Sequence, residues 1–156
     1  MRCVVQRSGP ARVEIDGRLS GEIDGGLVVL AAFEPADTAR ELAWMAHKLP
    51  RLRIFNDEAG KMNLALTETG GGILLVSQFT LYGNCRKGNR PSFVGSAPPE
   101  QAAVLYARFG ELLRRLRGDN FTEPVGELDT GRQRFMVRVD SKFRSTAEIE
   151  QLPIRP

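Results

Sequence analysis

Alternating apolar and polar positions predict several β-strands in the first third of the chain. Residues 11–16 have this alternation, residues 2–7 form a strand-like run that contains Val4 and Val5, and residues 19–23 are expected to be the return strand after Asp16-Gly17. An Asp-Gly pair between two such runs favours a two-residue hairpin turn, because glycine tolerates a positive φ. Residues 27–33 are apolar throughout, which is typical of a central strand buried on both faces. Similar runs predict three further strands, at residues 51–55, 72–81 and 135–139.

Two segments have the period of an amphipathic helix. Thr38 and Glu41 have the spacing of a capping box, and the apolar positions that follow predict a helix that ends near Pro50. A second helix is expected to begin near Ser96, with two prolines in its first turn, and to end at Gly118. Its apolar stripe consists of Ala102, Leu105, Tyr106, Phe109, Leu112, Leu113 and Leu116.

These elements together predict an α+β fold in one domain. The chain has 156 residues, of which 42% are hydrophobic and 26% are charged, within the range of ordinary globular domains. A chain of this length buries roughly two-thirds of its unfolded surface and needs neither disulfides nor a structural metal. We expect residues 1–156 to form a single domain, with residues 141–156 as a divergent, irregular tail.

The cysteine, histidine and apolar content excludes several kinds of site. Cys3, Cys85 and the single His47 cannot supply four good nitrogen and sulfur ligands, so no structural zinc is expected. His47 lies inside the first helix, far in sequence from any nucleophile, which argues against a Ser-His-Asp or Cys-His site. No run approaches the roughly 18 apolar residues of a membrane span, and no secretory signal begins the chain. We therefore expect a cytoplasmic protein without a membrane partner.

Basic residues are concentrated in two segments of a nearly balanced chain. The net charge is +3, but residues 84–118 contain seven basic and two acidic residues, and residues 132–144 contain five basic residues and one acidic residue. Such clustering favours a surface that faces a polyanion. Solvated helix and loop faces are the alternative explanation.

Polar side chains interrupt the predicted strand at residues 72–81. Ser77, Gln78 and Thr80 stand where a buried strand would continue, and a basic, glycine-containing loop follows between Tyr82 and Phe93. Hydroxyl and amide groups beside guanidinium groups and aromatic rings suit a ligand with a carbonyl, a phosphate and a base. A strand end followed by an ordinary surface loop is the alternative interpretation.

The segment SQFTLYGNCRKGNRPSF, residues 77–93, resembles the first signature of the D-aminoacyl-tRNA deacylases. Flanking pieces are similar to the family too, among them residues 5–7, 52–55, 60–63 and 97–99. The resemblance implies a homodimer of compact, β-barrel-like sheets with two helices each, and active sites at the subunit interface. It implies hydrolysis of the ester that joins a D-amino acid, or glycine, to the 3′ end of tRNA. It implies no metal or organic cofactor, and no DNA partner.

The resemblance also assigns roles to residues of the first signature. Gln78 and Phe79 would position the substrate or stabilise an oxyanion with their backbone amides, beside Ser77 in the catalytic set. Thr80 would be a candidate nucleophile, although a mechanism assisted by the ribose 2′-OH fits the absence of a neighbouring base. The residues expected to bind tRNA are Arg86, Lys87, Asn89, Arg90 and Phe93.

The family's second signature, a Gly-Pro turn after the last strand that excludes L-amino acids, is absent from its usual place. Residues 140–146 contain neither glycine nor proline. Gly9-Pro10, just after Arg7, is either an ordinary β-turn or a replacement for the missing gate. The gating hypothesis requires the pair to project toward Gln78, within its own subunit or across the dimer. The alternative function is a non-catalytic or chirally relaxed tRNA-binding relative; a purely structural module would have no reason to retain SQFTL.

Overall fold

The computed structural model describes residues 1–117, 121–122 and 135–139. Its largest sheet has the order β1 (Arg2–Ser8), β4 (Gly26–Ala32), β7 (Gly72–Ser77) and β8 (Phe121–Thr122). Strand β1 runs antiparallel to β4, whereas β4, β7 and β8 are parallel to one another. The two central strands β4 and β7 come from segments about 40 residues apart in sequence, which requires the helical crossover between them.

A second, three-stranded sheet contains the predicted hairpin. Strands β2 (Ala11–Ile15) and β3 (Arg18–Ile23) are antiparallel, and β9 (Phe135–Val139) pairs with the other edge of β2. Asp16 and Gly17 connect the hairpin with φ values of 50° and 76°. Both lie in the left-handed region that a type I′ turn requires, so the prediction from the Asp-Gly pair is confirmed.

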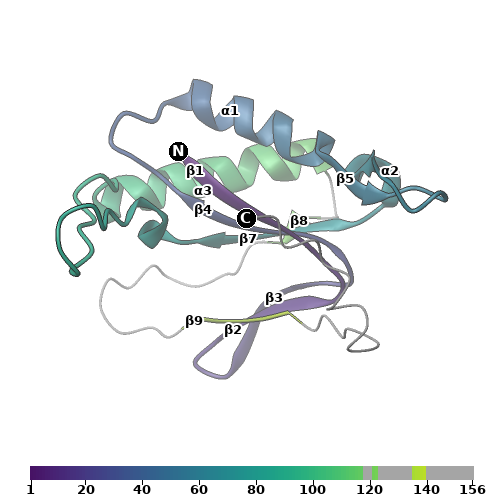
Figure 1. Cartoon of the computed structure of the whole chain (residues 1–156), viewed down its shortest axis with the longest axis horizontal. Coiled ribbons are helices and arrows are strands. Elements are labelled where there is room, and N and C mark those ends of the chain that lie inside the picture. Colours follow the sequence, from purple (N-terminus) through teal and green to yellow (C-terminus); the bar gives the residue numbers. More distant parts are fainter. Residues whose placement is uncertain (118–120, 123–134, 140–156) are drawn as a thin grey trace.

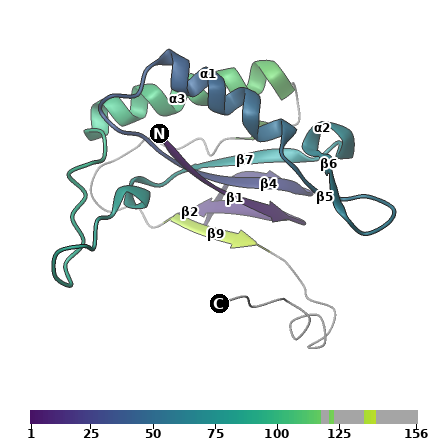
Figure 2. The same cartoon turned by 45° about the horizontal axis from the view of Figure 1, so that its top comes forward.

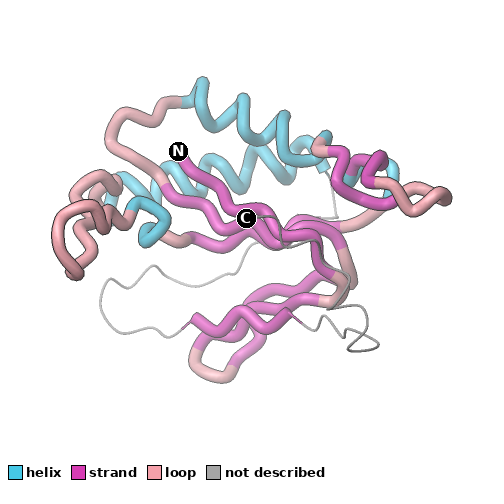
Figure 3. Tube along the Cα trace, viewed as in Figure 1, coloured by secondary structure: helices cyan, strands magenta, loops and turns pink. Residues whose placement is uncertain are grey.

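The remaining elements are a small hairpin and the helices. The hairpin pairs β5 (Arg53–Asn56) with β6 (Met62–Ala65). The α-helices of the described chain are α1 (Ala39–Lys48), α2 (Leu66–Thr69) and α3 (Pro99–Arg117), and short 3-10 turns span Leu49–Arg51 and Phe79–Tyr82. Figure 3 shows these helices and the strands by colour.

Helices and the second sheet cover opposite faces of the large sheet. Helices α1 and α3 lie on one face, and β2, β3 and β9 lie on the other (Figures 1 and 2). One core joins the helices to Leu27, Val29 and Leu75, and a second core joins the hairpin to Val28, Leu74 and their neighbours. The strand predicted at residues 27–33 is therefore confirmed as β4, covered on both faces, with Phe33 just beyond its end at Ala32.

The N-terminus of α1 is stabilised by the predicted capping box. The Thr38 N–H donates to Glu41 Oε2 at 2.8 Å, and the Arg40 N–H donates to Thr38 Oγ1 at 3.2 Å. These bonds satisfy backbone donors that have no partner within the helix. Because proline cannot donate a backbone hydrogen bond, the helix ends at Lys48, and Pro50 lies in the 3-10 turn that follows.

Three expectations from the sequence need correction. The α+β class is confirmed, but the described strands form three sheets and not one barrel-like sheet, and the described helices include the additional single-turn α2. The strand predicted at residues 72–81 ends at Ser77, because Gln78 turns the chain with φ −150° and ψ 83° into the 3-10 turn. The tail at residues 141–156 lies outside the described residues.

The parallel pairing of β4 with β7 begins with a close contact between two glycine backbones. Gly26 has a φ of +137°, and a Cβ atom there would lie 2.0 Å from the carbonyl oxygen of Gly72. No real Cβ contact is that short, and the obstacle is backbone that cannot rotate away. The first hydrogen-bonded residues of the β4–β7 pair therefore require glycine at position 26.

We expect Gly26→Ala to lower the free energy of unfolding by about 3 kcal/mol or more, because the new methyl group collides with β7. Gly60→Ala is the matched control: Gly60 also has a positive φ, +76°, but open space around its Cβ position. Its free energy of unfolding should fall only by the cost of the backbone strain, about 1 to 2 kcal/mol. Urea denaturation followed by circular dichroism measures both, and equal losses would contradict the collision.

Candidate active site

The predicted site segment lies where the parallel pair ends. The Gln78 N–H donates to the Ala31 carbonyl at 2.7 Å, one step beyond the last paired residues Ala31 and Ser77. The chain then enters the 3-10 turn Phe79–Tyr82, called the site turn below. Ser77 and Gln78 are half-buried, whereas Phe79 and Thr80 are exposed. The structure thus brings the four predicted catalytic residues together at one end of the large sheet.

The backbone amides of the site turn are not equivalent. The Leu81 N–H donates to Gln78 O at 3.3 Å and the Gly83 N–H donates to Thr80 O at 2.9 Å. Among the described residues, no group accepts a hydrogen bond from the Phe79 or Thr80 N–H, as expected for the first residues of a helical turn. The sequence resemblance implies that the backbone amides of Gln78 and Phe79 donate to the substrate. The Gln78 N–H already donates to Ala31, so only the Phe79 N–H of this pair remains available.

The basic loop, residues 84–92, protrudes beside the site turn. Its base is closed by a pair of hydrogen bonds, Asn84 N–H to Ser92 O at 2.8 Å and Ser92 N–H to Asn84 O at 3.0 Å. The Asn84 side chain also accepts from the Arg86 N–H at 3.0 Å, and Gly88 makes the reversal with a φ of +67°. All four polar residues that the sequence assigned to tRNA binding are exposed, namely Arg86, Lys87, Asn89 and Arg90.

An aromatic contact joins this loop to the site turn. The Phe93 ring meets the Phe79 ring edge to face, with centroids 5.3 Å apart and planes at 70°. Gly83 leaves room for the pair, since a Cβ there would lie 3.2 Å from Phe93 Cε1 and 3.0 Å from the Thr80 carbonyl oxygen. Both rings remain partly exposed, so a flat ligand group could contact them without rearrangement of the core.

Acidic groups lie behind the site turn and interact with its last residue. Tyr82 is buried, and the carboxylates of Glu34 and Asp37 are the acidic groups that act on its hydroxyl. Burial, together with the negative charges of Glu34 and Asp37, raises the pKa of Tyr82 to about 12. The N-terminal ammonium group pairs with Asp37, which is itself buried. Tyr82 is therefore neutral near neutral pH and serves as a buried anchor for the turn.

Arg7, Gly9 and Pro10 lie at the opposite end of the large sheet from Gln78. Arg7 pairs with Leu27, whereas the partner that accepts from Gln78 is Ala31. The strand length from Leu27 to Ala31 is about 13 Å, and Gly9 and Pro10 lie beyond Arg7 in the direction away from Gln78. Arg7 instead donates to Ile54 O at 2.9 Å and Asn56 Oδ1 at 2.8 Å. Because β1 runs antiparallel to β4, Gly9-Pro10 lies away from the Gln78 of its own subunit, and a gate across a dimer stays a prediction.

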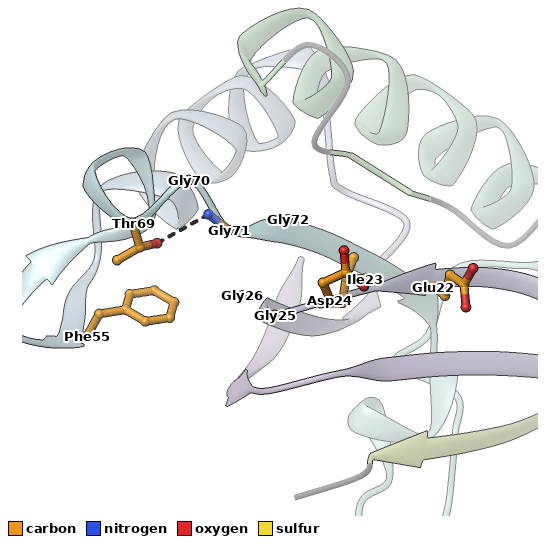
Figure 4. A pocket seen from close by; sticks show the side chains of 10 residues that line it. All are labelled: Glu22, Ile23, Asp24, Gly25, Gly26, Phe55, Thr69, Gly70, Gly71 and Gly72. Carbon is orange, nitrogen blue, oxygen red and sulfur yellow. Dashed lines mark hydrogen bonds between the residues drawn. The ribbon is translucent and has the colours of Figure 1, made fainter.

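An open pocket of about 590 Å³ also lies at that far end (Figure 4). The ring of Phe55 faces the backbone of Gly25 and Gly26 across it, and its acidic residues are Glu22 and Asp24. None of the predicted catalytic or tRNA-binding residues lines this pocket. In one copy of the chain, the predicted reactive groups thus lie on an exposed turn, away from this pocket.

The described residues contain no group of three or more His, Cys, Asp or Glu side chains placed to hold a metal ion. None of the described helices is both long and apolar enough to cross a membrane. No described side chain forms a hydrogen bond with the Thr80 hydroxyl that would let it act as a general base. What the site offers chemically is two backbone amides without an acceptor among the described residues, the hydroxyls of Ser77 and Thr80, and adjacent cations.

The sequence is similar to one protein family and to several deacylases. A family described as D-Tyr-tRNA(Tyr) deacylase matches residues 4–142. A D-aminoacyl-tRNA deacylase of Desulfatibacillum aliphaticivorans is 58% identical over 109 residues, which cover 70% of this chain and 75% of the relative. One of Geobacter metallireducens is 54% identical over 114 residues, or 73% of this chain and 76% of the relative.

Two solved structures resemble the fold. A c-Myc DNA unwinding element binding protein superposes with a TM-score of 0.78 at 35% identity, covering 89% of this chain and 91% of that chain. A probable eukaryotic D-amino acid tRNA deacylase superposes with a TM-score of 0.70 over 88% of this chain and 93% of that chain. Its identity of 18% makes it a likeness of fold alone.

Proposed function

Because the chain belongs to the D-Tyr-tRNA(Tyr) deacylase family, we propose that it is a D-aminoacyl-tRNA deacylase, a hydrolase of translational proofreading. It cleaves the ester between a D-amino acid and the 3′-terminal ribose of tRNA, releasing free amino acid and tRNA; glycyl-tRNA is a second substrate that we propose. The observation that carries this function is the 54 to 58% identity to deacylases over about three quarters of the chain. Residues 1–156 act as a single deacylase domain in this proposal.

The unpaired amides of the site turn would stabilise the transition state. Water adds to the ester carbonyl carbon and gives up a proton, which the adjacent ribose 2′-OH relays to the 3′ oxygen, and the carbonyl oxygen becomes an oxyanion. The N–H groups of Phe79 and Thr80 have no other acceptor among the described residues and can donate to that oxygen. Collapse of the intermediate breaks the bond to the ribose 3′ oxygen, which takes up a proton and leaves. Ser77 and Gln78 orient the turn and the amino acid from the end of β7.

Thr80 has no partner among the described residues suited to remove its proton, so the proposal favours attack by water, assisted by the ribose 2′-OH, over attack by Thr80. A threonine hydroxyl needs an adjacent base to be an effective nucleophile. No described His, Asp or Glu side chain forms a hydrogen bond with Thr80. The role that remains for Thr80 is to hold the substrate by its hydroxyl and its amide.

The basic loop would hold the tRNA backbone next to the site turn. Arg86, Lys87 and Arg90 are exposed and carry three positive charges on a loop whose base is fixed by two backbone hydrogen bonds. Asn89 adds a donor, and Phe93 offers a ring on which a base of the tRNA end can stack. Because the loop and the turn share the Phe79–Phe93 contact, tRNA bound here would be close to the reactive amides.

A homodimer would bring the far end of one sheet to the site of its partner. Gly9-Pro10 follows β1, and the pairing of Ala11 with Val139 places the end of β9 beside it. In the family, a Gly-Pro turn after the last strand forms the gate. The proposal is that Gly9-Pro10 presents a rigid backbone edge to the partner's aminoacyl group, with Arg7 anchoring β1 through Asn56. Rejection of L-amino acids would then be steric.

The first test is release of the amino acid from D-aminoacyl-tRNA by the purified protein and by Thr80→Ala. We expect turnover by the wild type and a loss of about tenfold in kcat/KM for the variant, the scale of one hydrogen bond from the hydroxyl, because the Thr80 backbone amide remains. A D-aminoacyl-tRNA whose terminal ribose lacks the 2′-OH separates the two mechanisms. Turnover of that substrate at the normal rate would contradict assistance by the 2′-OH.

The same assay decides between an enzyme and the alternative function. If tRNA binds but no aminoacyl-tRNA of either chirality is hydrolysed, the chain is a non-catalytic tRNA-binding relative. Similar rates for D and L substrates would instead identify a chirally relaxed enzyme.

Charge reversal at Arg86 and Lys87 should weaken the binding of all tRNAs alike, because phosphate contacts carry little sequence information. For Arg86→Glu/Lys87→Glu we expect the slope of log Kd against log salt to fall by about one for each phosphate that the loop no longer binds. Arg40→Glu/Lys61→Glu is the matched control, since it changes the net charge equally at exposed positions outside the loop. Equal weakening by both double variants would exclude a specific role for the loop.

Gly9→Ala/Pro10→Ala should raise the rate on L-aminoacyl-tRNA relative to the D form by about tenfold, the scale on which a pocket wall discriminates by shape. A Cβ at Gly9 meets no atom within 4 Å, so the fold should tolerate the change. Melting temperature and sedimentation velocity check the fold and the dimer. A dimer with an unchanged ratio of rates would show that the gate lies elsewhere.

A further inference from the structure

We propose that Arg2 is a positioning residue for deacylation, holding the site turn from the first residue of β1; this inference rests on the proposed function. Arg2 pairs with Ala32 across the antiparallel strands, and the adjacent Ala31 accepts from Gln78. The start of β1 therefore lies at the same end of the sheet as the site turn. From this position the Arg2 side chain extends to the last two residues of that turn.

Arg2 makes two different contacts with the turn. Its Nη1 donates to the Leu81 carbonyl oxygen at 3.0 Å, and its Cζ lies 4.4 Å from the centroid of the Tyr82 ring. The first contact satisfies a carbonyl near the C-terminus of a short helical turn, where positive charge is favourable. The second is a cation–π contact with a ring whose other side is held in the core. Together they fix both the backbone and the last side chain of the turn.

The turn has few other restraints. Its N-terminus has no side-chain cap, and its hydrogen bond from Leu81 to Gln78 is long at 3.3 Å. Further fixed points are the Gly83 to Thr80 bond at 2.9 Å, the buried Tyr82 and the contact of Phe79 with Phe93. A four-residue turn with so few bonds opens readily without a contact from another element. Arg2 supplies such a contact from a strand distant in sequence.

The chemistry requires arginine at this position. A planar guanidinium can stack on a ring and donate in its own plane at the same time, whereas a lysine ammonium cannot make both contacts with this geometry. The carboxylates of Glu34 and Asp37 and the ammonium group of Met1 are the other charges near Tyr82. The Met1 ammonium pairs with both carboxylates, so Arg2 is the cation that contacts the Tyr82 ring itself.

The experiment compares Arg2→Ala and Arg2→Lys with wild type on D-aminoacyl-tRNA. We expect kcat to fall about tenfold or more in both variants, while KM changes less than about threefold and the salt dependence of tRNA binding is unchanged. Methylguanidine at millimolar concentration should restore part of the kcat of Arg2→Ala, and methylammonium should not. The control is Arg53→Ala, which removes an exposed arginine bonded to the Asn63 carbonyl and should retain the wild-type kcat.

Hydrogen exchange gives a readout that does not depend on turnover. The Gly83 amide, which donates to Thr80 O, should exchange at least about tenfold faster in Arg2→Ala than in wild type. Suppose that the wild type is active and that Arg2→Ala equals it both in kcat and in the exchange rate of the Gly83 amide. That result overturns the positioning role of Arg2 and leaves the proposed function intact. A reduced salt slope with unchanged kcat would make Arg2 a phosphate contact and would also overturn it. An inactive wild type overturns the proposed function, and with it the role of Arg2.

Discussion

Parallel pairing between β4 and β7 is the constraint on which the rest of the structure depends. Both strands are buried on both faces, so the helices and the β2–β3 hairpin must cover opposite sides of them. The pairing begins at the glycine contact between residues 26 and 72 and ends with the bond from Gln78 to Ala31. Since the backbone donors of buried strands need partners, that last bond determines where the chain can leave the sheet and begin the site turn.

The two ends of this pair differ in chemistry. At one end are the glycine backbones, Phe55 and the two carboxylates around the open pocket. At the other end are unpaired amides, exposed rings and cations. The reactive end has no enclosing wall of its own among the described residues. A substrate bound there gains its surroundings from the tRNA itself and, in the proposed homodimer, from a second copy of the chain.

Contacts distant in sequence restrain the site turn, because the turn has too few bonds to hold itself. Tyr82 anchors it in the core beside Glu34 and Asp37, Phe93 packs against Phe79, and Arg2 holds Leu81. These contacts come from the loop after β4, the segment after the basic loop and the first strand. The amides that would meet the oxyanion are therefore oriented before substrate arrives, which lowers the reorganisation needed in the transition state.

Much of the fold and the position of the site could be predicted from sequence. Alternation, the Asp16-Gly17 turn and the Thr38 capping box specify local structure, because each depends on residues only a few positions apart. The polar residues after a buried run marked Ser77 to Thr80 for the same reason. The pattern missed the end of β7, since Leu81 and Tyr82 continue the apolar run although they belong to a turn.

Only the tertiary structure decided which distant residues meet at the site. The antiparallel register of β1 on β4 brings Arg2 to the site turn and carries Arg7, Gly9 and Pro10 to the opposite end. The same fold uses the Gln78 amide in the sheet and leaves that of Phe79 unpaired among the described residues. Periodicity identifies a strand and its buried face, but the direction and register of pairing depend on packing between segments far apart in sequence.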